Sequence, residues 1–300
     1  MRGFGGFKRY RRYFKNYIHI ALSVIFNRFP IVIVFRDGDN VIAKNPGFVH
    51  LASTGLKFQY EEKSDILSFN FNGINLKFHG VFFNNDLADT FGFEVYAMPY
   101  FQEKTVVDIG ANIGDTSVYF VLKGAKRVIA LEPSPFAFRY LEENAERNGI
   151  KEKIICLNEG VGRIDSSIKM ERNERDVTGT KAVNQGHGVT VHIMTLKNLI
   201  ETEGIQSGSV LKMDCEGCEY DSLLSSDCDT LAVFQEIIME YHNDPTPLVR
   251  KLSECGYSIK LNGKDIHEVS TNVIGYKYKG IGYIYAKFVK SYNKQGKSVS

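Results

Sequence analysis

The stretch from Thr105 to Ser117 combines residue types that can bind a ligand, because an apolar run leads directly into a glycine turn and a helix start. Gly110 and Gly114 let the backbone approach a ligand closely, and the first turn of a helix offers N–H groups without intrahelical partners. A second apolar run ends at Glu132, 22 residues after Gly110. An acid at roughly this offset is placed to accept hydrogen bonds from ribose hydroxyls, so the pattern predicts a nucleoside site.

The departures from a dinucleotide-binding turn indicate which nucleoside cofactor fits. Asn112 stands where the second glycine of G-x-G-x-x-G admits a pyrophosphate, and Asp108 and Asp115 would repel that group. S-adenosylmethionine has no phosphate, and carboxylates attract its sulfonium and ammonium groups. The residues favour S-adenosylmethionine; an NAD-dependent oxidoreductase, a non-catalytic nucleoside-binding protein and a mere packing turn are the alternatives. The predicted cofactor-binding residues are Asp108, Gly110, Asn112, Gly114, Asp115, Thr116, Glu132, Asn158 and Glu159, of which Asn158 or Glu159 contacts adenine.

A second group of acids and a histidine follows two later apolar runs, which end near Met213 and Met239. The carboxyl ends of parallel strands meet at one edge of a sheet, so these residues are predicted to lie beside the glycine turn. A histidine there can take a proton from an attacking hydroxyl near neutral pH. Glu219 is assigned a structural role. The predicted catalytic residues are Asp214, Glu216, Glu240 and His242.

Metal-free acid and base chemistry is the favoured interpretation of these acids. The alternative is a divalent cation such as magnesium, bound by Asp214 together with Glu240 or Asp244, which would lower the pKa of a hydroxyl. Cys215 and Cys218 resemble half of a zinc or redox site, but no second pair lies at metal spacing. We therefore expect these two cysteines to pack in a strand-to-helix turn.

Apolar runs alternate with helical patterns over the second part of the chain, which predicts βαβ units and a parallel sheet. The sequence predicts a helical stretch from about residue 85 to residue 105 and a polar loop from 162 to 190. The predicted strands are Thr105–Ile109, Arg127–Leu131, Lys153–Leu157, Val210–Met213, Val233–Met239, Tyr257–Leu261 and Tyr283–Val289.

The first part of the chain has a different pattern. Polar residues recur every three or four positions between Lys8 and Asn27, which predicts one amphipathic helix. Short β-rich runs follow up to about His79, and Asn72-Gly73 between two of them predicts a hairpin. We expect an N-terminal helix and small β-rich lobe over 1–84, a catalytic domain over 85–290 and a frayed tail over 291–300.

Taken together, the motifs resemble those of the FkbM-type methyltransferases over about residues 94–257. The resemblance rests on Val107–Asp115, Ala130–Pro135, Asn144 with Asn148, Leu211–Glu219 and Met239–His242. It implies an α/β, Rossmann-like class I methyltransferase sheet, mostly parallel, with seven strands of which one is antiparallel. It also implies methyl transfer from S-adenosylmethionine to a hydroxyl of a carbohydrate or other small metabolite. Cys215 and Cys218 depart from the small or aliphatic residues usual in the family.

Composition narrows the partners and the compartment. The whole chain carries 37 basic and 35 acidic residues, which is too balanced for a general polyanion binder, and we expect no nucleic acid partner. The chain has 5 cysteines, an odd number in so long a chain, which predicts no disulfide framework and a reducing, cytoplasmic location. No uncharged run reaches the ~20 residues needed to span a bilayer.

The basic residues concentrate at the N-terminus, where residues 1–36 hold eight and no acid. We expect the N-terminal helix to cover its own domain or a second subunit of a homo-oligomer. Peripheral attachment to an anionic membrane is the alternative, because basic and aromatic residues together suit the headgroup region.

Overall fold

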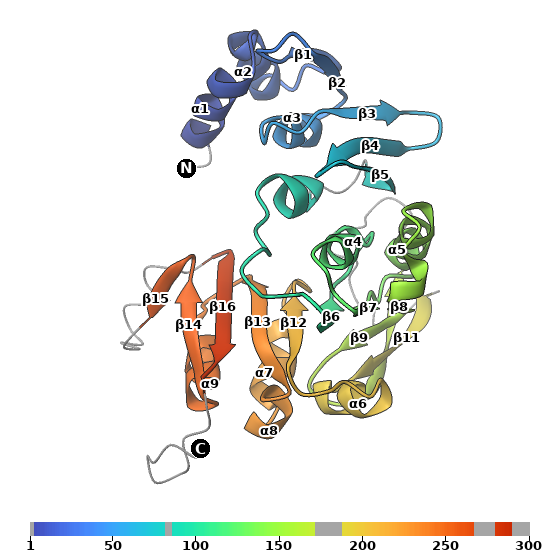
Figure 1. The fold of residues 1–300 in the computed structure, drawn as a ribbon, viewed down its shortest axis with the longest axis vertical. Helices are drawn as coiled ribbons and strands as arrows, with labels where there is room; N and C mark the ends of the chain where they lie inside the picture. The colour runs from blue at the N-terminus through green and yellow to red at the C-terminus, as the bar shows by residue number, and fades with distance from the viewer. Residues whose placement is uncertain (1–2, 82–85, 172–187, 267–279, 290–300) are drawn as a thin grey trace. The chain divides into compact units, whose positions relative to one another are not determined.

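The computed structural model describes residues 3–81, 86–171, 188–266 and 280–289, and the chain forms two compact units (Figure 1). The first comprises Met1–Val95 with Glu146–Gly149, and the second comprises Tyr96–Ala145 with Ile150–Ser300. The sequence placed this boundary after residue 84. The predicted frayed tail lies outside the described residues.

The first unit begins with two helices rather than the single one predicted. Helix α1 spans Gly3–Tyr13 and helix α2 spans Tyr17–Ile25. Between them, Phe14 forms an isolated antiparallel bridge with Phe35, and the Asn16 side chain donates to the Val32 carbonyl at 2.7 Å. This backbone pairing with the following strand replaces the helical hydrogen bonds there. None of the helices in the described part of the chain is long and apolar enough to span a membrane.

The β-rich lobe contains a two-stranded hairpin, a short helix and a three-stranded antiparallel sheet of order β3-β4-β5. Asn72 and Gly73 both have positive φ, as the predicted two-residue turn between β4 and β5 requires. At the edge strand β5, the Asn148 side chain accepts from the Lys77 N–H at 2.9 Å and donates to the Lys77 carbonyl at 2.8 Å. The elements are β1 (Ile31–Val34), β2 (Asn40–Ala43), α3 (Pro46–Ala52), β3 (Phe58–Glu61), β4 (Ile66–Phe71) and β5 (Ile74–His79).

The predicted helical stretch from residue 85 to residue 105 is wrong for most of its length. The structure has α-helical residues Asp86 and Leu87 that lead into a π-helical turn, η2 (Ala88–Gly92), and no helix over residues 93–105. Gly92 and Pro99 account for this, because glycine favours a helix end and proline cannot donate the next helical hydrogen bond.

The second unit is built on an eight-stranded sheet of order β15-β14-β16-β13-β12-β6-β7-β8. Strands β13, β12, β6, β7 and β8 are parallel, and β16 runs antiparallel between β13 and β14. The seven predicted strands are present; an eighth, β15, was missed, and it forms an antiparallel hairpin with β14 through Asn262-Gly263. The strands are β6 (Thr105–Ile109), β7 (Arg127–Leu131), β8 (Ile154–Leu157), β12 (Ser209–Met213), β13 (Phe234–Tyr241), β14 (Tyr257–Leu261), β15 (Lys264–Ile266) and β16 (Gly282–Phe288).

This is an α/β, Rossmann-like sheet of the class I methyltransferase type, and it creates a switch point beside β6. From β6 the chain order proceeds to β7 and β8 on one side and to β12 and β13 on the other. Ligand crevices in open α/β sheets form at such a point, outside the carboxyl ends of the strands. The helices are α4 (Asp115–Leu122), α5 (Pro135–Arg147), η3 (Lys151–Lys153), α6 (Leu196–Thr202), α7 (Cys218–Ser225), α8 (Cys228–Leu231) and α9 (Thr246–Glu254).

The segment predicted as a polar loop from 162 to 190 is partly a second, smaller sheet. Strands β9 (Glu159–Val161), β10 (Ser166–Glu171) and β11 (Gly188–Met194) pair in the order β10-β11-β9. The antiparallel pairing of β10 with β11 supplies the regular structure that weak periodicity hid. Residues 172–187 of the predicted loop lie outside the described residues.

The cysteine prediction is also wrong. Cys215 is bonded to Cys218 and Cys228 to Cys255, while Cys156 is a free thiol. The cytoplasmic expectation rested on the absence of disulfides, so the cysteines no longer support it.

Candidate active site

The glycine turn after β6 is packed against the end of β12. Gly110 has φ +73°, and a Cβ there would lie 1.9 Å from the Asp214 carbonyl oxygen, so no other residue fits. Asn112 also has positive φ, a conformation that asparagine tolerates. Gly114, with φ +86°, precedes α4, whose first turn has no side-chain cap. The turn therefore brings the start of α4 and the end of β12 together.

Beneath this turn lies a buried ion pair. Lys212 Nζ is 2.9 Å from Asp108 Oδ1, without the alignment of a hydrogen bond, and it donates to the Gly110 carbonyl at 2.8 Å. The hydroxyls of Thr116 and Ser117 donate to Asp108 Oδ2 at 2.7 and 2.6 Å. Burial alone would lower the pKa of Lys212, but the carboxylates of Asp108 and Asp214 raise it. Lys212 thus neutralises the Asp108 carboxylate, which the sequence predicts to be a cofactor-binding group.

Glu132 ends β7 beside the glycine turn. Its Oε2 accepts the Asn112 N–H at 2.9 Å, and its Oε1 accepts the Ser134 N–H at 2.8 Å. Burial raises the pKa of Glu132 to about 7 against these two hydrogen bonds. Each carboxylate oxygen has a second lone pair, so the side chain fits the ribose of a nucleoside.

The remaining predicted cofactor residues lie nearby in the fold. The Asn158 amide donates to the carbonyls of Glu132 and Pro133 at 2.8 and 3.2 Å, which holds the chain after β7 in place. Glu159 Oε1 lies 3.5 Å from His192 Nδ1. Asp115 is buried at the start of α4. The adenine contact predicted for Asn158 or Glu159 stays a prediction.

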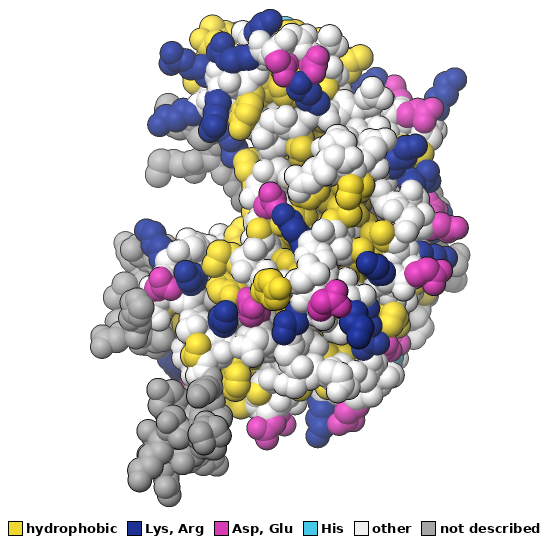
Figure 2. Space-filling model, viewed as in Figure 1, with side chains coloured by type: hydrophobic (Ala, Val, Ile, Leu, Met, Phe, Trp, Pro, Cys, Tyr) yellow, Lys and Arg dark blue, Asp and Glu magenta, His cyan; other side chains and the backbone are white. Residues whose placement is uncertain are grey.

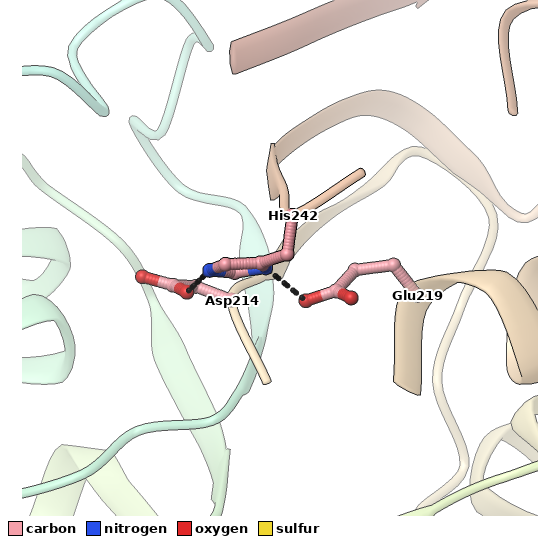
Figure 3. Close-up of side chains that lie close together, drawn as sticks. All are labelled: Asp214, Glu219 and His242. Atoms are coloured by element: carbon pink, nitrogen blue, oxygen red, sulfur yellow. Dashed lines mark ion pairs between the residues drawn. The ribbon is translucent and has the colours of Figure 1, made fainter. Parts of the chain in front are cut away.

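The four predicted catalytic residues come together around His242, which follows β13. Its Nε2 lies 3.8 Å from Asp214 Oδ1, 3.5 Å from Glu216 Oε2 and 3.9 Å from Glu240 Oε1. Its Nδ1 lies 3.7 Å from Glu219 Oε1, so the two ring nitrogens face carboxylates on opposite sides (Figure 3). Acids from β13 and from the turn after β12 thus surround one imidazole.

Tyr96, which lies outside the predicted set, holds this cluster. The Tyr96 hydroxyl donates to Asp214 Oδ2 at 2.7 Å, and Tyr96 is almost wholly buried. Lys212, also outside the predicted set, lies one position before Met213 and pairs with Asp108 rather than with this cluster. A lysine inside an otherwise apolar strand makes Lys212 unusual in the sequence but does not indicate its partner, and no pattern points to Tyr96.

The Glu219 side chain holds the turn after β12. Its carboxylate is fully buried and accepts the N–H groups of Cys215 and Gly217 at 2.7 and 2.8 Å. Glu216 and Gly217 both have positive φ within this turn, which the Cys215–Cys218 disulfide closes. The turn therefore fixes Glu219 beside His242 Nδ1 and leaves Glu216 largely exposed near Nε2.

Residues 108–259 match the Methyltransferase FkbM domain, which is half of the chain. The chain belongs to the FkbM methyltransferase family. The matched range contains the glycine turn and the whole cluster around His242. It confirms the resemblance that the motifs predicted.

Among known proteins, this FkbM domain is 27% identical over 162 residues to a hexuronic acid methyltransferase of Haloferax volcanii, covering 53% of this chain and 66% of that protein. It is 23% identical over 165 residues to methyltransferase 1 of Beauveria bassiana, covering 47% of this chain and 66% of that protein. The chain thus spans just under two thirds of either relative. A solved tRNA m1G37 methyltransferase of M. jannaschii aligns with a TM-score of 0.42 and 15% identity, covering 86% and 73% of the two chains.

The electrostatics of this FkbM site bear on the proton acceptor predicted from the sequence. Glu219, followed by the charges of Glu216 and Asp214, raises the pKa of His242 to about 9 against the effect of burial. At neutral pH the imidazole is therefore protonated, and in that state it can donate a hydrogen bond but cannot accept a proton. Its role as a base stays a prediction, and it requires that something displace the proton.

Proposed function

We propose that the protein transfers a methyl group from S-adenosylmethionine to a hydroxyl of a carbohydrate or other small metabolite. Membership of the FkbM methyltransferase family is the observation that carries this proposal. The hexuronic acid methyltransferase among its relatives supports a carbohydrate acceptor.

S-adenosylmethionine supplies an electrophilic methyl group when it is bound. On the chain's side, Glu132 is placed to accept hydrogen bonds from the ribose, with its carboxylate fixed by the N–H groups of Asn112 and Ser134. The close contact of Gly110 with the end of β12 sets the cofactor turn beside Asp214. Methyl transfer is an in-line displacement, so positioning of this kind supplies most of the rate.

The acceptor side is formed by the acids around His242. A hydroxyl that enters here meets carboxylate oxygens that can accept its hydrogen bond, and it must release its proton as the carbon–oxygen bond forms. Asp214 is the best placed of these groups, because Tyr96 fixes Oδ2 while Oδ1 faces His242. Glu216 is 65% exposed, so the site is open to solvent on that side.

Cofactor binding is the first test. Isothermal titration with S-adenosylhomocysteine and with NAD should show binding of the former, and Glu132→Ala should weaken it by about 1 to 3 kcal/mol because hydroxyls lose a charged partner. Glu152→Ala, at an exposed position, is the matched control. Preferential binding of NAD, or an unchanged affinity in folded Glu132→Ala, would contradict the assignment.

Acceptor chemistry is the second test. Methyl-labelled cofactor should transfer label to members of a panel of uronic acids, hexoses and glycans, and the label should survive mild acid and base as an ether does. Label recovered as an ester or on nitrogen would replace the hydroxyl in this proposal with a carboxyl or amine acceptor.

A further inference from the structure

Helix α2 has one buried side and one exposed side. Ile20 is fully buried, whereas Ile18, Leu22 and Ile25 are exposed. Residues three and four positions apart lie on the same helix face, and Phe26, just after the helix, continues it. The α2 apolar face is the name used below for Ile18, Leu22, Ile25 and Phe26. The expectation that the N-terminal helix covers its own domain therefore describes only one side of α2.

The exposure of the α2 apolar face is large. Ile25 is 71% exposed and Phe26 is 63% exposed. Half of the large apolar side chains that are exposed in the described part of the chain lie between Phe7 and Ile42. Single exposed apolar residues are ordinary on a protein surface, but several of them on one helix face indicate an interaction surface.

A groove of about 480 Å³ lies between α2 and the segment that leads into β1. Leu22 and Phe26 of the α2 apolar face line this groove, together with Phe29 and Pro30. Arg28 also lines it, and its guanidinium lies 5.6 Å from the centre of the Phe26 ring. Apolar walls with a cation among them suit a molecule that carries hydrocarbon next to a negative charge.

Basic side chains accompany the α2 apolar face. Residues 1–36 hold eight basic residues and no acid. Figure 2 shows Lys and Arg side chains gathered where Figure 1 labels α1 and α2. In the described part of the chain, no ion pair involves any of the six exposed basic residues of this segment, which are Lys8, Arg11, Arg12, Lys15, Arg28 and Arg36. Their charge is therefore available to an anionic partner.

The combination of charge and apolar exposure favours one kind of partner. In a twofold dimer the same patch of both copies meets, so a second copy would bring these cations against one another. A nucleic acid would attract the cations, but its backbone offers phosphates and sugars rather than an apolar layer. An anionic lipid layer complements both features, because headgroups attract the basic residues and acyl chains receive the apolar ones.

We propose that α1, α2 and the segment from Phe26 to Pro30 bind peripherally to an anionic lipid membrane. The α2 apolar face enters the boundary between headgroups and acyl chains, and the basic side chains contact the headgroups. Helix α2 has 9 residues, so it lies in the membrane surface and does not cross the bilayer. The proposal concerns the first unit and does not depend on the proposed methyl transfer.

Sedimentation of the full chain with lipid vesicles is the first test. The protein should sediment with phosphatidylserine vesicles but not with phosphatidylcholine vesicles, and about 0.5 M salt should weaken binding because it screens the headgroup charge. Ile25→Ser with Phe26→Ser should reduce binding at least about 10-fold, since two apolar side chains no longer enter the lipid. Ile74→Ser, which changes an exposed residue of β5, is the matched control and should bind as the wild type does.

The contribution of charge needs a separate pair of variants. Lys15→Gln with Arg28→Gln should weaken binding to phosphatidylserine vesicles about 10-fold or more. Lys63→Gln with Lys126→Gln removes the same charge at exposed positions outside α1 and α2, and it should leave binding near that of the wild type. An equal loss in both double variants would show that only net charge attracts the protein, which would overturn the proposed surface.

Fluorescence locates the contact. The chain contains no tryptophan, so one introduced residue reports on its own surroundings. Phe26→Trp should shift its emission to shorter wavelength on phosphatidylserine vesicles, and lipids brominated on their acyl chains should quench it. Ile74→Trp should keep its emission in both experiments. This measurement retains an aromatic side chain at position 26, so it is informative even where the serine variant fails to fold.

Three outcomes would overturn the membrane assignment. The first is equal vesicle binding by the wild type and the folded Ile25→Ser, Phe26→Ser variant. The second is unchanged Phe26→Trp emission on vesicles that sediment the protein. The third is a wild-type dimer that becomes a monomer in the serine variant by light scattering, without vesicle binding by either, because a second copy would then cover the α2 apolar face.

Discussion

Two acidic residues at neighbouring strands have opposite electrostatic surroundings in this protein. Asp108, inside β6, is fully buried and faces Lys212 and two hydroxyls. Asp214, just beyond β12, is partly exposed and shares one histidine with three other acids. The chain neutralises the first carboxylate with its own lysine and leaves the second group with an excess of negative charge. The first arrangement holds the glycine turn, and the second is suited to bind a cationic or hydrogen-donating partner.

Breaking the ion pair between Asp108 and Lys212 should have the largest effect on stability. Lys212→Met leaves Asp108 buried without its cation and removes the hydrogen bond to the Gly110 carbonyl, so we expect a loss of about 3 to 5 kcal/mol in the free energy of unfolding. Urea denaturation measures this loss. Adding Asp108→Asn to Lys212→Met should restore a large part of it, because the uncompensated charge is then gone. A loss below about 1 kcal/mol in Lys212→Met would mean that the pair does not hold the turn.

Glu132 is a third acid, near the cofactor turn, and it should make the stability of the protein depend on pH. Its pKa is raised by burial from 4.5 to about 7, so between these values the folded protein binds more protons than the unfolded chain. This penalty is absent below about pH 4.5 and grows to about 3 kcal/mol of lost stability above pH 7.

Urea denaturation of the wild type and of Glu132→Gln at pH 5 and pH 8 separates this effect from other titrations. The difference in unfolding free energy between the two proteins should change with pH in favour of the variant at pH 8. A difference that is the same at both pH values would show that the buried carboxylate carries no such penalty.

The smallest effect should come from Tyr96, which contacts Asp214 directly and lies beside Lys212, the partner of Asp108. The Tyr96 ring faces Lys212 Nζ at 5.5 Å, and its hydroxyl donates to Asp214. Tyr96→Phe keeps the ring and removes one hydrogen bond to a carboxylate, which should cost about 1 to 2 kcal/mol of stability. It should also slow methyl transfer while leaving S-adenosylhomocysteine affinity near that of the wild type. Tyr100→Phe, at an exposed position, is the control. Equal turnover in the two variants would show that Tyr96 has no role on the acceptor side of the site.

The sequence predicted the residues that lie at strand ends, because parallel strands bring their carboxyl ends to one edge. Glu132, Asp214 and His242 could be grouped on that basis alone. Lys212 could not, since a single lysine in an apolar strand does not reveal which acid it meets. Tyr96 is 118 residues from Asp214 in the chain and comes from a segment without periodicity, so only the folded structure joins them.

The same limit explains the errors elsewhere. The break between α1 and α2 is imposed by pairing with β1 and Phe35, which helical periodicity does not contain. The disulfides depend on the distance between cysteines 27 residues apart in one case and on the turn after β12 in the other. Neither disulfide could be predicted from the number and the spacing of the cysteines.

The Asn148 side chain affects how strand β5 can pair with another polypeptide chain. Strand β5 is an outer strand of its sheet, and such a strand offers unpaired peptide groups to any extended chain that approaches. The Asn148 amide mimics a peptide unit and occupies both groups of Lys77. One side chain thus makes both peptide groups of Lys77 unavailable to an extended chain that approaches this edge.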